Sequence, residues 1–173
     1  MIWIDEVEIF GFGPFPSLKT RFHPGLNFVV GENESGKTSL HSAILGILFG
    51  IRHSNLYRRE GATEFRGRLL LRQGNDQLEI QRSFSDDYVV VTRLGSKELS
   101  FSGRATFMGR SQERLAYDQI LKDWFGIDDQ SLFRSSVFVE QQALQIEPDR
   151  EAGQQLSRLI TGSEELPYEE IGA

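Results

Sequence analysis

Apolar and polar residues alternate from the second position of the chain, as in a strand with one face buried. The stretch 2–10 reads IWIDEVEIF, and side chains two positions apart lie on the same face of a strand. A second short strand is predicted at 18–22, and the apolar run at 26–30 predicts a third, buried strand. Glycines and prolines at 11–16 predict a loop between the first two strands. The chain is therefore expected to open with an antiparallel hairpin, followed by a buried strand.

The spacing of the apolar residues becomes helical after the third strand. It predicts a helix at 38–49, and Gly50 is suited to end this helix. Charged and small polar residues at 51–63 then predict a loop. Alternation and turn clusters beyond this loop predict an antiparallel meander, with strands at 65–72, 78–84 and 88–94.

A second amphipathic helix is predicted at 111–125. Ser111 suits its N-terminal end, and Gly126 suits its stop. Its expected buried stripe consists of Leu115, Ile120, Leu121, Trp124 and Phe125. The weaker patterns around this helix predict a short strand at 98–101, a mobile loop at 102–110, a short helix at 129–134, a strand at 136–139 and a helix at 148–160.

The segment between the third strand and the first helix reads GENESGKT. It matches GxxxxGK[ST], the Walker A pattern, in which glycines let backbone amides point at phosphate oxygens. Lys37 is expected to reach the β- and γ-phosphates of ATP as a catalytic residue, and the Thr38 hydroxyl is expected to bind Mg²⁺. The residues predicted to bind the nucleotide are Asn33, Glu34, Ser35, Gly36, Lys37, Thr38 and Ser39.

The composition is that of a globular protein, and it excludes several kinds of site. With 173 residues, of which 39% are hydrophobic, the chain is long enough for one domain with a core. It has no cysteine and three scattered histidines, which excludes disulfides and thiolate metal sites and argues against a zinc site. No signal-like segment opens the chain, and no apolar run approaches membrane-spanning length. A cytoplasmic protein without membrane contact is therefore expected.

The net charge of −6 arises at the end of the chain, since residues 140–173 hold eight acidic and two basic residues. An acidic balance argues against nonspecific coating of nucleic acid, but it is compatible with a local basic patch. The pattern favours a solvated strand face over such a patch. The candidate residues are Arg58, Arg59, Arg66, Arg68 and Arg72.

The order of these elements resembles the N-terminal half of the ATPase head of SMC-like coiled-coil ATPases. The resemblance rests on GFGPF, GLNFVVGENESGKTSL, the helix ending LFG, the meander and the late SLFRSSVFVEQQAL. It is nearest to bacterial relatives with a GFGPF loop and to the double-strand-break repair branch. The implied fold class is α/β, a P-loop, ABC-ATPase-like half-head with an antiparallel β-meander and helical segments.

The resemblance also implies further site residues. In this family a glutamine after a later strand, the Q-loop, lies near the magnesium ion and the γ-phosphate. The matching residue is Gln141, with Gln142 as the second choice, and its amide oxygen could ligate Mg²⁺ or orient a water. Without the resemblance, this pair would be interpreted as exposed polar residues after a strand. Relatives in the repair branch commonly carry an arginine in the loop after the first strand, which this chain lacks, whereas Arg58 and Arg59 match a basic stretch near the nucleotide.

Two motifs that this family needs for hydrolysis, Walker B and an SGGQ-like signature, do not occur in the sequence. In the family both lie in a C-terminal half, beyond a long coiled coil. The resemblance therefore implies an ATPase head lobe at 1–162 and an acidic tail at 163–173 that leads toward a coiled coil. The implied partners are the protein's own C-terminal half, a second head that dimerises with nucleotide, and DNA. The chain alone is expected to bind ATP but to hydrolyse very little.

Two functions are thus predicted. The first is an ATP-binding head that hydrolyses ATP once its C-terminal half completes it, in DNA repair or chromosome maintenance. The alternative is a nucleotide-gated protein-interaction module with little hydrolysis. A GTPase would show DxxG and NKxD, and residues 123–126 satisfy only the first pattern. A kinase would need a basic lid and an acceptor pocket, and neither is identifiable.

Overall fold

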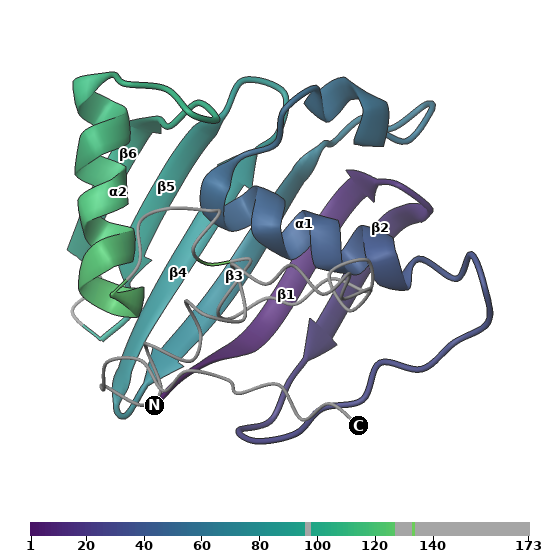
Figure 1. Cartoon of the computed structure of the whole chain (residues 1–173), viewed down its shortest axis with the longest axis horizontal. Helices are drawn as coiled ribbons and strands as arrows, with labels where there is room; N and C mark the ends of the chain where they lie inside the picture. Colours follow the sequence, from purple (N-terminus) through teal and green to yellow (C-terminus); the bar gives the residue numbers. More distant parts are fainter. Residues whose placement is uncertain (96–97, 127–132, 134–173) are drawn as a thin grey trace, which may run out of the picture. The chain divides into compact units, whose positions relative to one another are not determined.

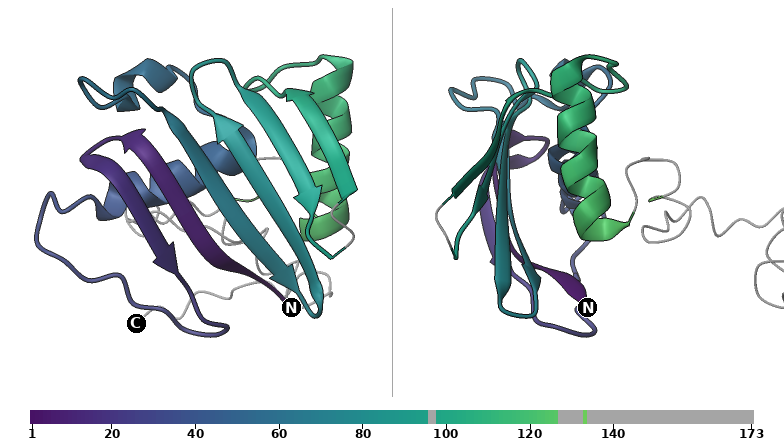
Figure 2. Two further views of the ribbon diagram at one scale, coloured as in Figure 1. Left: turned by 180° about the vertical axis from the view of Figure 1, so that it is seen from behind. Right: turned by 90° about the vertical axis from the view of Figure 1, so that its left-hand side faces the viewer.

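The computed structural model describes residues 1–95, 98–126 and 133. The strands are β1 (Ile2–Phe12), β2 (Phe15–Arg21), β3 (Arg66–Gln73), β4 (Asp76–Ser83), β5 (Tyr88–Arg93) and β6 (Glu98–Arg104). The helices are α1 (Lys37–Phe49), the short 3₁₀ helix η1 (Ser54–Tyr57) and α2 (Gln112–Phe125). The strands form an antiparallel sheet in the order β2-β1-β3-β4-β5-β6. Figure 1 and Figure 2 show both α-helices on one face of this sheet.

The predicted opening hairpin and the predicted meander are both present. The loop of the hairpin is shorter than predicted, because β1 continues to Phe12, which pairs with Phe15 at the start of β2. The meander keeps β3, β4, β5 and β6 as neighbours in chain order. The predicted mobile loop at 102–110 is wrong in its first part, since Ser102 pairs with Val90 and Arg104 pairs with Tyr88. Backbone pairing there extends the short predicted strand to Arg104.

The core lies between the sheet and the helices. Alternate residues of the strands are fully buried, as the period-2 pattern predicts. They include Val7, Ile9, Leu69, Leu71, Leu78, Ile80, Val89 and Val91. Helix α1 follows its prediction closely and is buried along its whole second half, from Ala43 to Phe49. A helix that is apolar on all sides belongs in a protein interior, so α1 is held firmly over the sheet.

The predicted buried strand at 26–30 is wrong. No described strand pairs with this segment, and Leu26, Phe28 and Val30 are 82%, 80% and 89% exposed. A strand needs a neighbour for its backbone hydrogen bonds, and β2 ends at Arg21. The Asn27 side chain accepts from the His23 amide and donates to the His23 carbonyl, which forms a turn after β2. The apolar pattern is thus present without a partner strand among the described residues.

Helix α2 has the predicted ends, but a different buried face. The Ser111 side chain caps its first turn by accepting from the Arg114 amide, and Gly126 ends it with φ of 70°. Leu121 and Trp124 are buried as predicted, whereas Leu115 is 60% exposed. Arg114 and Tyr117 are buried in its place. Hydropathy cannot find a buried arginine, because only its hydrogen-bond partners make its burial favourable.

The predicted helix at 129–134, apart from Phe133, lies outside the described residues. So do the predicted strand at 136–139, the predicted helix at 148–160 and the acidic tail at 163–173. None of the helices in the described part of the chain is long and apolar enough to cross a membrane.

Ion pairs cover the face of the sheet that points away from the helices. Glu6 on β1 is 5% exposed at its side chain and is paired with Lys19 at 3.0 Å, Arg21 at 2.9 Å and Arg68 at 2.6 Å. Arg68 also bonds Glu79 on β4. The other two strand arginines have partners as well, since Arg72 bonds Asp5 at 2.8 Å and Arg66 lies 4.0 Å from the centre of the Phe10 ring. The interpretation of a strand face is therefore confirmed for Arg66, Arg68 and Arg72.

This network predicts a loss of stability in acid. The hydrogen bond from Arg21 is the main cause that lowers the pKa of Glu6 from 4.5 to about 2, against the opposing effect of burial, and Lys19 and Arg68 contribute further. The stabilisation is therefore complete above pH 4.5 and is lost as the pH falls toward 2. We expect it to amount to roughly 1–2 kcal/mol, because water screens the exposed ends of Arg21 and Lys19.

The measurement is urea unfolding at a series of pH values for the wild type and for Glu6→Gln. The variant should be less stable at neutral pH and should lose less stability on acidification. Glu8→Gln, on the same strand face, is the control and should retain the acid-dependent loss. An identical pH dependence in the Glu6→Gln variant would contradict the assignment.

Candidate functional site

The loop at 31–36 leads directly into α1. This helix begins at Lys37, one residue before its predicted start, and its N-cap residue is Gly36. No side chain caps the first turn. The first N–H groups of a helix have no partner within the helix, and they lie at the positive end of its dipole. An anion bound at this end would supply the missing acceptors.

The two glycines of the motif occupy positions that exclude a side chain. Gly36 has φ of 98°, and a Cβ atom there would lie 2.4 Å from the Phe15 ring. A Cβ atom on Gly31 would lie 2.5 Å from the Ser35 Oγ atom. Between them, Glu34 adopts the left-handed conformation with φ of 65°. The loop is therefore a tight backbone cradle of the kind that binds phosphate oxygens through its amides.

Lys37 folds back over this cradle. Its Nζ atom donates to the Gly31 carbonyl at 2.8 Å and to the Glu32 carbonyl at 2.6 Å, and the side chain is exposed. An ammonium group has three N–H donors. Two of them fix its position on the loop, and the third remains for a ligand.

The structure brings most of the other predicted site residues to the same place. Asn33, Glu34, Ser35 and Thr38 are exposed on the loop and the first turn of α1, and Ser39 is half-buried. Gln141 and its alternative Gln142 lie outside the described residues. No cluster of three or more histidine, aspartate or glutamate residues that could hold a metal occurs in the described ranges. Of the two residues predicted to bind the metal ion, Thr38 and Gln141, the structure thus describes Thr38, whose hydroxyl could contact the ion.

The hairpin turn at 11–15 covers the loop, which the sequence did not predict. Pro14 and Phe15 lie against Gly36, and Gly13 lies against the Ser39 side chain. The signal was present as GFGPF, in which Gly11 and Gly13 both have positive φ. Phe12, by contrast, is fully buried in the core. This turn, which joins two strands of the sheet, therefore packs against the start of α1 and holds it in place.

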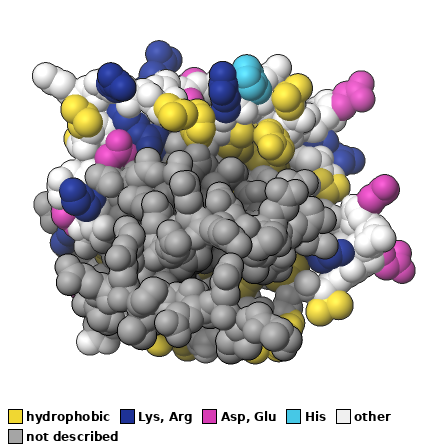
Figure 3. Space-filling model, viewed as in Figure 1, with side chains coloured by type: hydrophobic (Ala, Val, Ile, Leu, Met, Phe, Trp, Pro, Cys, Tyr) yellow, Lys and Arg dark blue, Asp and Glu magenta, His cyan; other side chains and the backbone are white. Residues whose placement is uncertain are grey.

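The predicted basic stretch is joined to this turn. The Arg59 side chain donates to the Pro14 carbonyl at 2.9 Å, and its amide donates to the Gly11 carbonyl at 2.9 Å. The Gly13 amide donates to the Tyr57 carbonyl at 2.7 Å. Figure 3 shows Lys and Arg side chains along the upper edge of the face viewed, the edge where Figure 1 shows η1. Arg58 and Arg59 thus belong to a segment that is bonded to the turn at 11–15, and this turn lies between the segment and the phosphate-type loop.

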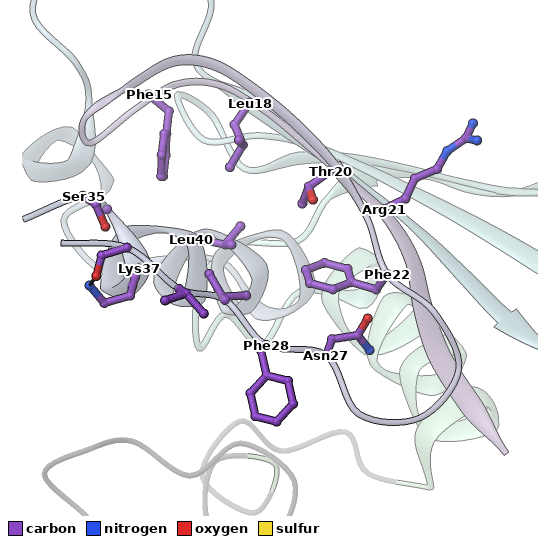
Figure 4. A pocket seen from close by; sticks show the side chains of 14 residues that line it. Phe15, Leu18, Thr20, Arg21, Phe22, Asn27, Phe28, Ser35, Lys37 and Leu40 are labelled. Carbon is purple, nitrogen blue, oxygen red and sulfur yellow. Dashed lines mark hydrogen bonds between the residues drawn. The ribbon is translucent and has the colours of Figure 1, made fainter.

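A pocket of about 410 Å³ lies between β2 and the segment that leads to the loop. Figure 4 shows Leu18 and Thr20 of β2 pointing toward Leu40 of α1, whereas Arg21 points away. Most of the lining is apolar, and Gly36 and Lys37 border it on the side of the loop. Its chemistry suits an apolar chain segment better than a phosphate group.

Replacing Gly36 with alanine tests the tight cradle. We expect a loss of about 1–3 kcal/mol of stability and weaker ATP binding, because the new methyl group would overlap the Phe15 ring at a backbone φ of 98°. Gly25→Ala is the matched control, since Gly25 has φ of 101° but no atom within 4 Å of the added Cβ. Urea unfolding and calorimetry measure the two effects. Equal losses in both variants would show that the contact with Phe15 is unimportant, whereas a second substitution, Phe15→Ala, should partly rescue Gly36→Ala.

The cradle, the uncapped helix and the lysine together have the arrangement expected of a phosphate-binding loop. The profile of the family described as AAA domain matches residues 6–168, and the chain therefore belongs to the AAA domain family.

Relatives in this class are proteins of DNA repair. The chain is 31% identical over 98 residues to the DNA double-strand break repair Rad50 ATPase of Pyrococcus abyssi. These residues make up 57% of the chain and 11% of that protein. It is 25% identical over 181 residues to the Rad50 ATPase of Archaeoglobus fulgidus, covering 100% of the chain and 18% of the relative. The DNA replication and repair protein RecF of Limosilactobacillus fermentum is 31% identical over 103 residues, covering 56% of the chain and 28% of the relative. The chain thus spans less than a third of each relative, and the predicted resemblance to SMC-like P-loop ATPases is confirmed.

Proposed function

We propose that the chain binds ATP with Mg²⁺ at 31–39 and forms the N-terminal part of an ATPase head that acts in DNA repair or chromosome maintenance. One observation carries this proposal: the uncapped start of α1 faces a loop on which two carbonyls already hold the Lys37 ammonium. This arrangement offers backbone donors, a helix dipole and a fixed positive charge to one anion. A triphosphate matches all three.

The predicted roles of the side chains follow from the charge of the ligand. Lys37 would bind the β- and γ-phosphates as a point charge, and the Thr38 hydroxyl would hold Mg²⁺ together with phosphate oxygens. Bound Mg²⁺ would neutralise part of the charge that develops during phosphoryl transfer. Gln141 is proposed to lie near the γ-phosphate and to orient a water, and this role rests on the family resemblance alone.

The exposed segment at 26–30 supports the proposal that the C-terminal half completes this head. Its side chains border an apolar pocket beside β2, and its backbone pairs with no described strand. Burial of each large apolar side chain contributes about 1.5–3 kcal/mol. A strand from the proposed C-terminal half, laid beside 26–30, would satisfy the backbone and bury these side chains. The Walker B carboxylates that the sequence lacks would arrive with the same half.

The partners of the completed head are part of the proposal. The names of the relatives describe DNA repair and DNA replication, and on this ground we propose DNA as the substrate of the whole assembly. A second head that closes with nucleotide at the interface is proposed from the family resemblance.

Two measurements test the proposed function. Calorimetry of this chain with ATP and Mg²⁺, and with GTP for comparison, should show binding of ATP; the absence of any heat of binding would reject a site that works without the C-terminal half. Turnover of ATP should then be measured after the C-terminal half is added. Hydrolysis at background level in that completed protein, with ATP binding intact, would instead support a nucleotide-gated interaction module.

A further inference from the structure

The end of α1 opposite to the phosphate-type loop is held by buried polar side chains. These are Arg82 of β4 together with Arg114 and Tyr117 of α2, and we call this set the C-terminal clamp. Arg82 is 1% exposed, Arg114 is 6% exposed and Tyr117 is fully buried. Buried arginines are rare, because desolvation of the charge is costly unless hydrogen bonds and counter-charges compensate for it. The partners of the clamp therefore show what it is built to hold.

The shortest bond from each clamp residue to the end of α1 goes to a different carbonyl. The Arg82 Nε atom donates to the Ile47 carbonyl at 2.9 Å. The Tyr117 hydroxyl donates to the Leu48 carbonyl at 2.7 Å, and an Nη atom of Arg114 donates to the Phe49 carbonyl at 2.9 Å. The last carbonyls of a helix lack partners within the helix and lie at the negative end of its dipole. Two guanidinium groups thus complement the end of the helix whose opposite, positive end faces the proposed nucleotide.

The same guanidinium groups also hold the segment that joins β6 to α2. Arg82 donates to the Ala105 carbonyl at 2.8 Å, and Arg114 donates to the Thr106 carbonyl at 3.2 Å. Asp87 and Asp118 supply the counter-charges, at 3.3 Å from Arg82 and 2.8 Å from Arg114. Arg82 and Arg114 therefore each donate both to the end of α1 and to the segment 105–111, and Arg114 connects these two to the start of α2. Displacement of any one of them would strain the bonds to the other two.

We infer that Arg82, Arg114 and Tyr117 are positioning residues that couple nucleotide binding at the start of α1 to the segment 105–111 and α2. This inference rests on the proposed ATP site. Helix α1 is a hydrogen-bonded rod buried along its second half, so a shift that a triphosphate imposes on its first turn reaches its last turn. The clamp passes this shift to 105–111. Coupling between two sites is reciprocal, so a change at 105–111 also changes the affinity for nucleotide.

The coupled segment lies at the surface, where such a shift can be read. Met108 is 79% exposed and has φ of 53°, an unfavourable conformation for a residue with a side chain. Leu115, in the first turns of α2, is 60% exposed. Arg104, directly before the segment, and Arg110, within it, are exposed as well. In Figure 1, α1 crosses the sheet from the side of β2 to the side where α2 lies, so α1 spans the distance between the proposed site and the clamp beside this surface.

Hydrogen exchange of the chain with and without ATP and Mg²⁺ tests the coupling. In the wild type, nucleotide should slow exchange at 31–40 and also slow it roughly fivefold or more at 105–111, the lower limit of typical coupling between sites. In the Arg114→Met variant, slowing at 31–40 should persist while slowing at 105–111 disappears. Arg114→Lys, which keeps the charge but can make fewer of the bonds, should give an intermediate effect. Arg110→Met removes an exposed arginine of the same segment and is the control that should behave like the wild type.

The outcomes separate this inference from the proposed function. Slowing at 31–40 without any change at 105–111 in the wild type overturns the coupling and leaves the ATP site standing. Slowing at neither region overturns both. Tyr117→Phe keeps the buried ring and removes only the hydroxyl bonds to the Leu48 and Ile47 carbonyls, so it provides a folded variant if Arg114→Met unfolds. Coupling as strong in Tyr117→Phe and Arg114→Lys as in the wild type would show that the clamp is structural only.

Discussion

Replacing Lys37 with alanine is expected to weaken ATP binding roughly 10- to 150-fold. A charge-assisted contact is worth about 1.5–3 kcal/mol, and each 1.4 kcal/mol corresponds to a factor of ten in affinity. The fold should be little affected, because Lys37 is exposed and bonds only to Gly31 and Glu32 of its own loop. Calorimetry with ATP and Mg²⁺ measures the affinity, and urea unfolding checks the stability.

Lys122→Ala is the matched control for this substitution. It removes one lysine charge in the last turn of α2, outside the phosphate-type loop, and it should retain the affinity of the wild type. An affinity of Lys37→Ala equal to that of the wild type would show that nucleotide does not bind at this loop.

Replacing Arg82 with methionine is expected to lower the free energy of unfolding by about 3–5 kcal/mol. Removal of one partner of a buried ion pair has an effect of this size. The substitution removes the short bonds to the carbonyls of Ile47 and Ala105, at 2.9 and 2.8 Å, and leaves them only the long bonds from Tyr117 at 3.5 Å and Arg114 at 3.4 Å. It also leaves the Asp87 carboxylate without its nearest cation. Urea unfolding of the two proteins measures the difference.

The pH dependence of this deficit provides a second check. Burial raises the pKa of Asp87 above its ordinary value, and the charge of Arg82 opposes this rise. Without Arg82 the pKa should rise further, so the carboxyl group takes up a proton more readily and the deficit should shrink as the pH is lowered. Arg93→Met on β5 removes an exposed arginine and should change stability by less than about 0.5 kcal/mol. A loss of similar size in both variants would contradict the role of burial.

Local patterns predicted the elements whose partners lie close in sequence. The hairpin of β1 and β2 and the meander from β3 to β6 pair strands that are adjacent in sequence, and helix α1 has a helical spacing of apolar residues within its own length. Alternation and helical spacing are enough to identify such elements. The phosphate-type loop was predicted on the same basis, because Gly31, Gly36 and Lys37 act through the conformation of a single short segment.

The errors occurred where a partner distant in the sequence decides the outcome. The run at 26–30 has a strand pattern, but its neighbour is not among the described strands, so its side chains remain exposed. Leu115 was expected in the core, and Arg114 was not. Arg114 is buried in the place of Leu115, because the carbonyls at the end of α1 accept hydrogen bonds from its guanidinium group and so compensate for the desolvation of its charge.

The sequence by itself determined the hairpin, the meander, helices α1 and α2 and membership of the SMC-like ATPases, and it predicted the P-loop, since these follow from short-range patterns of glycine, lysine and apolar residues. Only the tertiary structure decided that the turn at 11–15 covers the loop and that Arg82, Arg114 and Tyr117 hold the far end of α1. The reason is physical. Hydrogen bonds between residues 35 to 69 positions apart depend on how the sheet and helices pack, and no local pattern of residues encodes that packing.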